Sequence, residues 1–285
     1  MADWGKILSR GNVEDRRSMA PAAMGGLSLT GIAIVVLLNF FAGGDVGDVL
    51  NQLESMPSDP ISVQQQNGVE KKEFEGQDSY EVFASTVLGS NNEMWKDIFN
   101  KSNKDYEPPK LVLFRSATES GCGLSQSEVG PHYCPADKTI YLDETFFEEL
   151  TRRFGAKGGD VAEAYVIAHE VAHHAQNEFG IMDEVNSAGR SNSENANQLS
   201  VKLELQADCF AGLWANSIKD KDIFTVNEIH EAMDAAAAVG DDRIQKRTSG
   251  AVSPESWTHG SSEQRVGWFT KGYESGQVNV CNTFI

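Results

Sequence analysis

The chain has 285 residues, and 40% of them are hydrophobic, which is enough for a sizeable core and excludes a globally disordered protein. Its 24 basic and 42 acidic side chains give a formal net charge of −18. A nucleic-acid-binding protein normally carries a basic excess that neutralises phosphates, so we expect no nucleic-acid partner. The length predicts one main domain with additional segments.

Residues 24–44 (MGGLSLTGIAIVVLLNFFAGG) are an uncharged, mostly apolar run of 21 residues. A helix of roughly 20 apolar residues can cross a bilayer, and core helices rarely extend this far without a polar face. A cleaved signal peptide is the alternative, but its apolar run is usually only about 7–15 residues long. Arginines precede the run and acidic residues follow it. We therefore predict a single-pass signal anchor, with residues 1–23 cytoplasmic and the remainder exported.

An exported domain with an even number of cysteines is typical of disulfide bonding, and this chain has four: Cys122, Cys134, Cys209 and Cys281. The first two are close in sequence, so they could form a local bridge and leave the last two to pair. The sequence alone permits three pairings, or four free thiols. Zinc binding by the four is disfavoured because they include no CxxC pair.

Polar, turn-rich residues 45–78 predict a linker, and residues 79–285 are expected to form the domain. Helical spacing of apolar residues predicts helices over residues 79–104, 144–154, 162–178, 199–218 and 226–239. Two strands are expected, at 110–116 and 139–143, with loops at 121–135 and 183–198 and a short helix within 253–285. These elements predict a helix-dominated α+β domain with a small sheet.

The helix predicted over residues 162–178 contains His169-Glu170-Val171-Ala172-His173. Two histidines four residues apart lie on one helix face, where both imidazoles can bind one Zn²⁺. Glu170 points toward the same cavity and can take a proton from a zinc-bound water. By chance the pattern arises in roughly one chain of this length per hundred. The uncharged neighbours fit a buried helix, so we predict a catalytic zinc site with one ion.

A catalytic zinc ion needs a third protein ligand and an open fourth position. Glu204 is the favoured candidate, on a helix that is otherwise largely apolar. Asp208 lies one turn further along the same face and could accept the N–H of a ligating imidazole. Cys209 could serve as a ligand only if it is not in a disulfide.

The remaining histidines have different expected roles. His174 lies about 100° round the helix from His173, so we expect it to be packed and hydrogen-bonded rather than a ligand to the same metal. His132 and His230 are expected to be structural or surface residues. His259 precedes a short helix that contains Arg265, and both could donate hydrogen bonds to the oxyanion of a tetrahedral intermediate.

Taken together, these motifs resemble the predicted bacterial neutral zinc metallopeptidases (YpfJ-like). The resemblance covers nearly the whole chain, in the segments RGNVEDRR, PHYCPADKTIYLD, AYVIAHEVAHHAQ, LELQADCFAG, GDDRIQ and THGSSEQRVGWF. The motifs are similar to those of gluzincin-type peptidases, so the resemblance implies a zincin-like domain. It also implies roles for six residues: His169, His173 and Glu204 as zinc ligands, Glu170 as general base, Asp208 as a carboxylate that orients a ligand, and His259 as a transition-state histidine. Ala172 departs from the glycine common in related sequences.

The expected function is therefore that of a zinc endopeptidase held in a bacterial cell membrane by one helix, with its catalytic domain on the periplasmic or extracytoplasmic side. Its substrate would be a peptide or protein, bound in an extended form along an edge strand at 139–143. The alternative is a catalytically silent, zinc-stabilised binding or scaffold protein of the cell envelope, in which the same ligands serve folding. The sequence does not predict the natural substrate or the oligomeric state.

Overall fold

The computed structural model describes residues 2–18, 72–73, 78–127, 130–155, 158–191 and 195–284. One folded unit includes Met1–Ser18 together with Lys71–Ile285. Residues 2–18 are thus part of the domain, whereas the sequence analysis had assigned them to a separate segment. The expected anchor at 24–44 and most of the linker at 45–78 lie outside the described residues. Within the described ranges, no helix is both long enough and apolar enough to cross a membrane.

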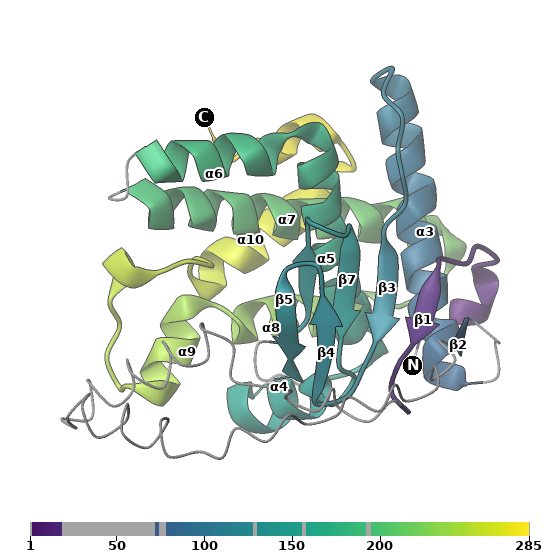
Figure 1. The fold of residues 1–285 in the computed structure, drawn as a ribbon, viewed down its shortest axis with the longest axis horizontal. Coiled ribbons are helices and arrows are strands. Elements are labelled where there is room, and N and C mark those ends of the chain that lie inside the picture. The colour runs from purple at the N-terminus through teal and green to yellow at the C-terminus, as the bar shows by residue number, and fades with distance from the viewer. Residues whose placement is uncertain are drawn as a thin grey trace, which may run out of the picture. The chain divides into compact units, whose positions relative to one another are not determined.

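A five-stranded sheet forms one layer of this unit, with strand order β2–β1–β3–β7–β6 (Figure 1). The strands are β1 (Val13–Asp15), β2 (Lys72–Glu73), β3 (Lys110–Leu113), β6 (His132–Cys134) and β7 (Thr139–Leu142). Strands β1, β3 and β7 are parallel, and β2 and β6 are antiparallel to their neighbours. The two predicted strands are confirmed as β3 and β7. The prediction that residues 139–143 form an edge strand is wrong, because β7 pairs on both sides and β6 occupies the edge.

A separate two-stranded hairpin consists of β4 (Ala117–Ser120) and β5 (Gly123–Gln126). The disulfide Cys122–Cys134 joins the tip of this hairpin to the end of β6. The segment 121–135, expected to be a loop, therefore contains two strands, β5 and β6. Strand β5 has four residues and β6 has three, and polar residues are frequent in both. They therefore lack the hydrophobic alternation that identifies a strand in a sequence.

Eight α-helices lie among the described residues: α3 (Ser79–Lys101), α4 (Phe146–Phe154), α5 (Asp160–Phe179), α6 (Ile181–Ser191), α7 (Ala196–Ile218), α8 (Val226–Ala238), α9 (Asp241–Thr248) and α10 (Ser262–Ser275). Short 3₁₀ helices lie at Trp4–Lys6, Lys219–Lys221, Pro254–Ser256 and Val278–Cys281. The predicted helices are confirmed, with 79–104 forming the single helix α3. The expected surface connection at 183–198 is wrong over its first half, because α6 occupies that region and lies beside α7 (Figure 1).

Helix α5 is the central helix and packs against α3, α7, α8 and β6. It ends at Gly180, whose φ of 82° is the left-handed conformation that favours glycine. Gly159 is the N-cap residue of α5, and Asp160 is its first helical residue. The Asp160 carboxylate accepts hydrogen bonds from the Ala2 backbone N–H and the Trp4 indole N–H, each 2.9 Å long. Hydrogen bonds from the N-terminal residues therefore stabilise the first turn of α5.

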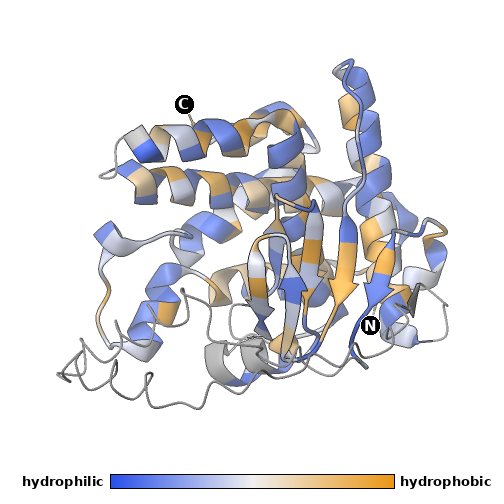
Figure 2. Cartoon of the chain, in the orientation of Figure 1, coloured by the Kyte–Doolittle hydropathy of each residue, from blue (hydrophilic) through white to orange (hydrophobic). Residues whose placement is uncertain are grey.

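Helices α7 and α10 approach each other closely because glycine lies at both contact points. A Cβ on Gly212 would lie 2.1 Å from the Phe269 carbonyl oxygen, and a Cβ on Gly272 would lie 2.0 Å from that of Cys209. The disulfide Cys209–Cys281 joins α7 to the C-terminal residues. Figure 2 shows that β3 is one of the more hydrophobic parts of the sheet, and its Leu111 and Leu113 belong to the main core. This packing fixes α5, α7 and α10 relative to one another.

Candidate metal centre

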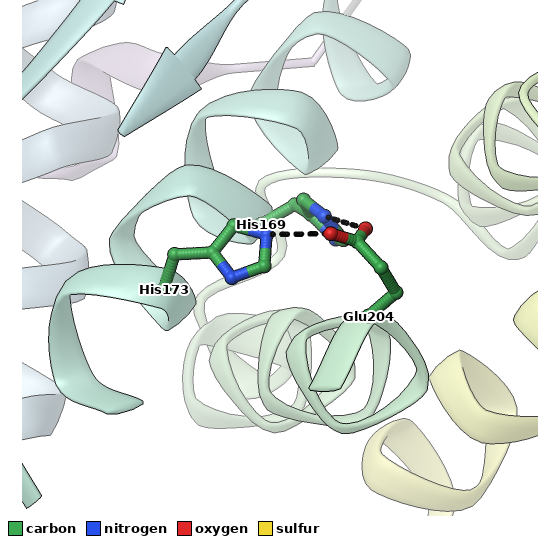
Figure 3. Close-up of side chains that lie close together, drawn as sticks. All are labelled: His169, His173 and Glu204. Atoms are coloured by element: carbon green, nitrogen blue, oxygen red, sulfur yellow. Dashed lines mark hydrogen bonds and ion pairs between the residues drawn. The ribbon is translucent and has the colours of Figure 1, made fainter. Parts of the chain in front are cut away.

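Three side chains from two helices converge on one point (Figure 3). His169 and His173 lie one turn apart on α5, and Glu204 lies on α7. The His169 Nε2 is 3.1 Å from Glu204 Oε2, and the His173 Nε2 is 3.3 Å from Glu204 Oε1. The ligand atoms of the three residues all lie within 4.8 Å of one another. The structure thus brings together all three of the expected metal ligands.

The other ring nitrogen of each histidine has its own acceptor. His169 Nδ1 donates to Asp208 Oδ1 at 3.0 Å, and His173 Nδ1 donates to Gln176 Oε1 at 2.8 Å. A neutral imidazole that carries its proton on Nδ1 has a lone pair on Nε2. Without a cation, a proton on each Nε2 satisfies the facing Glu204 carboxylate; when Nε2 loses that proton, both lone pairs face Glu204, which is the arrangement that a shared cation would stabilise.

Asp208 is fully buried. Its carboxylate accepts hydrogen bonds from three residues. Arg265 Nε donates to its Oδ2 at 2.8 Å, and Arg265 Nη2 donates to its Oδ1 at 2.9 Å. The Tyr165 hydroxyl donates to Oδ1 at 2.6 Å, and His169 completes the set. Buried charges are stable only when they are paired and hydrogen-bonded. This network holds the His169 ring in one orientation, as expected for Asp208.

The charges in the cluster shift the pKa values of His169 and Glu204. Burial alone lowers the pKa of His169, but the hydrogen bonds and charges of Asp208 and Glu204 outweigh it and raise this pKa to about 10. Burial alone raises the pKa of Glu204, but the two imidazoles outweigh it and hold this pKa well below its usual range. Glu204 is therefore ionised, as a metal ligand must be.

Glu170 lies between the two histidines on α5 and is only 7% exposed. Burial raises the pKa of its carboxyl group, and the nearby histidines oppose this shift. Among the described residues, no hydrogen-bond donor pairs with its carboxylate, and its oxygens are not among the fully enclosed atoms that lack a partner. Water can therefore reach this carboxylate. Beside three metal-ligand atoms, it is well suited to accept a proton from a water molecule.

The donor set fits zinc. Zinc binds imidazole nitrogen and carboxylate oxygen at roughly 2.0–2.2 Å, so two ligands of a tetrahedral ion are about 3.4 Å apart. The two nitrogen–oxygen separations of 3.1 Å and 3.3 Å are close to that spacing. Three protein ligands leave the fourth position of a tetrahedral ion open, which is the pattern of a catalytic rather than a structural site.

His259 lies in a loop that packs directly on α7. The Ser200 hydroxyl donates to the Thr258 carbonyl at 2.9 Å, and a Cβ on Gly260 would lie 3.3 Å from Leu205. Asp241 accepts hydrogen bonds from the backbone N–H groups of residues 258, 259 and 260 and lies 3.3 Å from the His259 Nδ1. The His259 side chain is 49% exposed. The loop is thus held against α7, the helix that carries Glu204, but no hydrogen bond among the described residues joins His259 to the three ligands.

The structure also shows the contacts of Cys209, His174 and His132. Cys209 is in a disulfide and is not a ligand, and the two bridges are those favoured by the sequence. His174 is fully buried, with ring nitrogens bonded to the Tyr133 hydroxyl at 3.1 Å and the Glu107 carbonyl at 2.7 Å, as expected for a packed histidine. His132 bonds to Ser125 and the Gly130 carbonyl, so it is also structural.

Three residues of the site were missed or given another role. Gln176 follows His173 by three residues and Tyr165 precedes His169 by four, so helical spacing was the signal that could have identified both. Arg265 was expected to donate to an oxyanion, but its Nε and Nη2 bond to Asp208 and its Nη1 donates to the Val239 carbonyl. Its side chain is only 3% exposed. Arg265 and Asp208 are 57 residues apart in the chain, so the sequence alone does not indicate that they pair.

The helical His-Glu-x-x-His motif, with a glutamate from a second helix, is typical of metal-binding sites in metal-dependent hydrolases. Residues 2–284 match the family model described as "Putative neutral zinc metallopeptidase", and the chain belongs to this family. The "Uncharacterized protein YpfJ" of Escherichia coli (strain K12) is 40% identical over 294 residues, which cover 99% of this chain and 98% of that protein. The "Uncharacterized protein Rv2575" of Mycobacterium tuberculosis (strain ATCC 25618 / H37Rv) is 41% identical over 222 residues, 73% of each chain. No solved structure matches the chain.

Proposed function

We propose that the chain is a zinc-dependent endopeptidase that is attached to a bacterial cell membrane through residues 24–44. The single observation that carries the catalytic part is the position of Glu170. Its side chain is 7% exposed and lies between the two histidines of the three converging ligands. A purely structural zinc site does not require such a group, because all four positions around its ion are filled by protein ligands.

The chain's own residues support each proton transfer. A bound zinc ion would lower the pKa of a water molecule toward about 7 and polarise the scissile carbonyl group. Glu170 accepts the proton of the attacking water and passes it to the leaving amine. Asp208 and Gln176 keep the two imidazoles in the orientation that exposes Nε2. His259 supports the developing oxyanion from the loop that packs on α7.

The free edge of the sheet supports a peptide or protein as substrate. Strand β6 lies at the end of the five-stranded sheet and contacts α5, the helix that carries the two histidines. An extended peptide can add to such an edge through main-chain hydrogen bonds. We therefore assign the substrate-binding edge to β6 in place of residues 139–143.

The two disulfides support a location outside the cytoplasm. Disulfides persist in oxidising compartments such as the periplasm and are rare in the cytosol. Both bridges lie in the same folded unit as the proposed metal centre. We therefore propose that this unit functions on the extracytoplasmic side of the membrane.

The test compares the wild-type chain with Glu170→Gln, and uses Glu178→Gln as a matched control on the same helix, where Glu178 pairs with Lys138 away from the cluster. Zinc content by elemental analysis should be equal in all three proteins. Cleavage of a peptide library should be lost in Glu170→Gln, by at least the 10²–10⁴-fold range typical of general-base removal, and kept in the control. Cleavage that persists in Glu170→Gln rejects the role of this residue. Zinc binding with no cleavage by the wild type favours the silent scaffold.

A further inference from the structure

Two buried glutamines connect the metal centre to the C-terminal residues. The Nδ1 of His173 points away from Glu204 (Figure 3) and lies 2.8 Å from Gln176 Oε1. Gln176 Nε2 donates to Gln206 Oε1 at 3.1 Å, and Gln206 Nε2 donates to the Cys281 carbonyl oxygen at 3.1 Å. The two glutamines are 0% and 5% exposed, so both amides make these bonds within the core. One series of hydrogen bonds therefore runs from the His173 ring to the C-terminal residues.

Two backbone carbonyl groups determine the direction of these hydrogen bonds. A carbonyl oxygen can only accept, so the Gln206 amide must turn its Nε2 toward Cys281 and its Oε1 toward Gln176. The Leu203 carbonyl likewise accepts from Gln176 Nε2, at 2.8 Å. Both protons of this Nε2 are then used, and Gln176 can offer only its Oε1 to the His173 ring. The ring must therefore carry a proton on Nδ1.

The proton on His173 Nδ1 decides which ring nitrogen can bind a metal ion. A ring nitrogen that carries a proton has no lone pair for a metal. If the Gln176 amide turned over, its Nε2 would face Nδ1 and favour a proton on Nε2 instead, which is the nitrogen 3.3 Å from Glu204 Oε1. That proton would block the nitrogen that faces the other two ligands.

The Cys209–Cys281 disulfide holds the last acceptor of the series in place. Both cysteines are fully buried, and Cys209 lies on α7 three residues after Gln206. The Thr283 hydroxyl donates to the Lys202 carbonyl at 2.6 Å, which is a second attachment of the same segment to α7. The Cys281 carbonyl is thereby fixed relative to the Gln206 amide.

We infer that Gln206 is a positioning residue of the metal centre, and that the Cys209–Cys281 bridge contributes to zinc affinity through it. Gln206 acts on His173 through Gln176, by keeping the Gln176 amide in the orientation that accepts the Nδ1 proton. Full zinc affinity therefore requires the closed bridge. The inference rests on the zinc-binding part of the proposed function and is independent of peptide cleavage.

The first measurement is the zinc affinity of the full chain, by competition with a chromophoric chelator. Gln206→Met removes the amide and keeps a side chain of similar length. Gln198→Met makes the same change at an exposed position of α7 and is the matched control. Partners that orient a ligating histidine contribute about 10–100-fold to metal affinity. We expect a loss of about 10-fold in Gln206→Met and no loss in the control.

A double-mutant cycle tests the contribution of the bridge. The variant Cys209→Ser/Cys281→Ser should lose zinc affinity by a factor similar to that of Gln206→Met. Adding Gln206→Met to it should cause no further loss, because both changes interrupt the same series of hydrogen bonds. The other bridge provides the control: in Cys122→Ser/Cys134→Ser, the Gln206→Met change should keep its full effect.

The second measurement is the exchange of the ring N–H protons with solvent, followed by NMR in protein with isotope-labelled histidine. In Gln206→Met the His173 Nδ1–H should exchange faster than in the wild type. The His169 Nδ1–H, which bonds to Asp208, should exchange at an unchanged rate. A general loss of stability would accelerate both signals, so the difference between them identifies a positioning role. The exchange is measured with and without zinc.

Equal zinc affinities in the wild type and Gln206→Met, or faster exchange at both histidines, would overturn the inference. A further loss of affinity when Gln206→Met is added to the variant without the Cys209–Cys281 bridge would also overturn it. A wild-type chain that binds no zinc would overturn the proposed function instead. The exchange measured without zinc would then still decide whether Gln206 positions the His173 ring.

Discussion

Replacement of Asp208 by Asn tests the buried network behind the metal centre. The change keeps the size of the side chain but removes its charge, so Arg265 loses its bidentate partner while its own side chain stays 3% exposed. Breaking a buried ion pair by removing one member costs about 3–5 kcal/mol. The free energy of unfolding should fall by this amount, which is a large part of the roughly 5–15 kcal/mol typical of native proteins.

The same substitution should weaken zinc binding. Asp208 accepts the His169 Nδ1–H, and loss of such an orienting partner typically costs 10–100-fold in metal affinity. The affinity is measured by competition with a chromophoric chelator, and the unfolding free energy by urea denaturation. Asp220→Asn is the control, because Asp220 is exposed and away from the cluster.

The double variant Asp208→Asn/Arg265→Met separates the two effects. Removing the unpaired guanidinium should recover part of the lost stability, because an uncompensated buried charge is the main penalty. It should not restore zinc affinity, because His169 still lacks its carboxylate. A single Asp208→Asn variant within about 1 kcal/mol of the wild type, or a double variant no more stable than the single, would refute this reasoning.

Two further predictions concern stability. The Cys209–Cys281 bridge spans 72 residues and the Cys122–Cys134 bridge spans 12. Replacing the cysteines by serine should lower the free energy of unfolding by about 4 kcal/mol for the first bridge and about 3 kcal/mol for the second. The loss is measured by calorimetry, and the reverse order would contradict the loop-entropy explanation. Burial, aided by neighbouring carboxylates, raises the pKa of Glu163 to about 7, so the stability that its neutral form contributes is lost as the pH rises through that value. Glu163→Gln should therefore reduce the decline in melting temperature between about pH 5 and pH 8, and an unchanged decline would count against the shift.

The sequence predicted the elements that carry strong periodicity. Helices α5 and α7 present long apolar faces, so their positions and the ligands His169, His173 and Glu204 could be inferred before the structure. The hydrophobic spacing also identified β3 and β7. Local patterns of this kind report which face is buried, but not which elements lie next to one another.

Other features depend on contacts between distant parts of the chain. Strand β1 has only three residues, with two acidic side chains, and it becomes a strand because β3 offers it a partner. Helix α6 is polar over most of its length and is stabilised by packing against α5 and α7. The role of Arg265 depends on the close approach of α7 and α10. Tertiary contacts of this kind decide secondary structure where local propensity is weak.

The position of β1 also determines which shortened forms of the chain will fold. Truncation at residue 79, the boundary suggested by composition, would delete one of the two partners of β3 and leave that side of β3 unpaired, an open edge that invites aggregation. Excision of residues 19–70, with a short turn joining β1 directly to β2, would keep every strand pair, because these neighbours already run in opposite directions. A crystallisable form of the chain should therefore be sought by internal deletion rather than by trimming from the N-terminus.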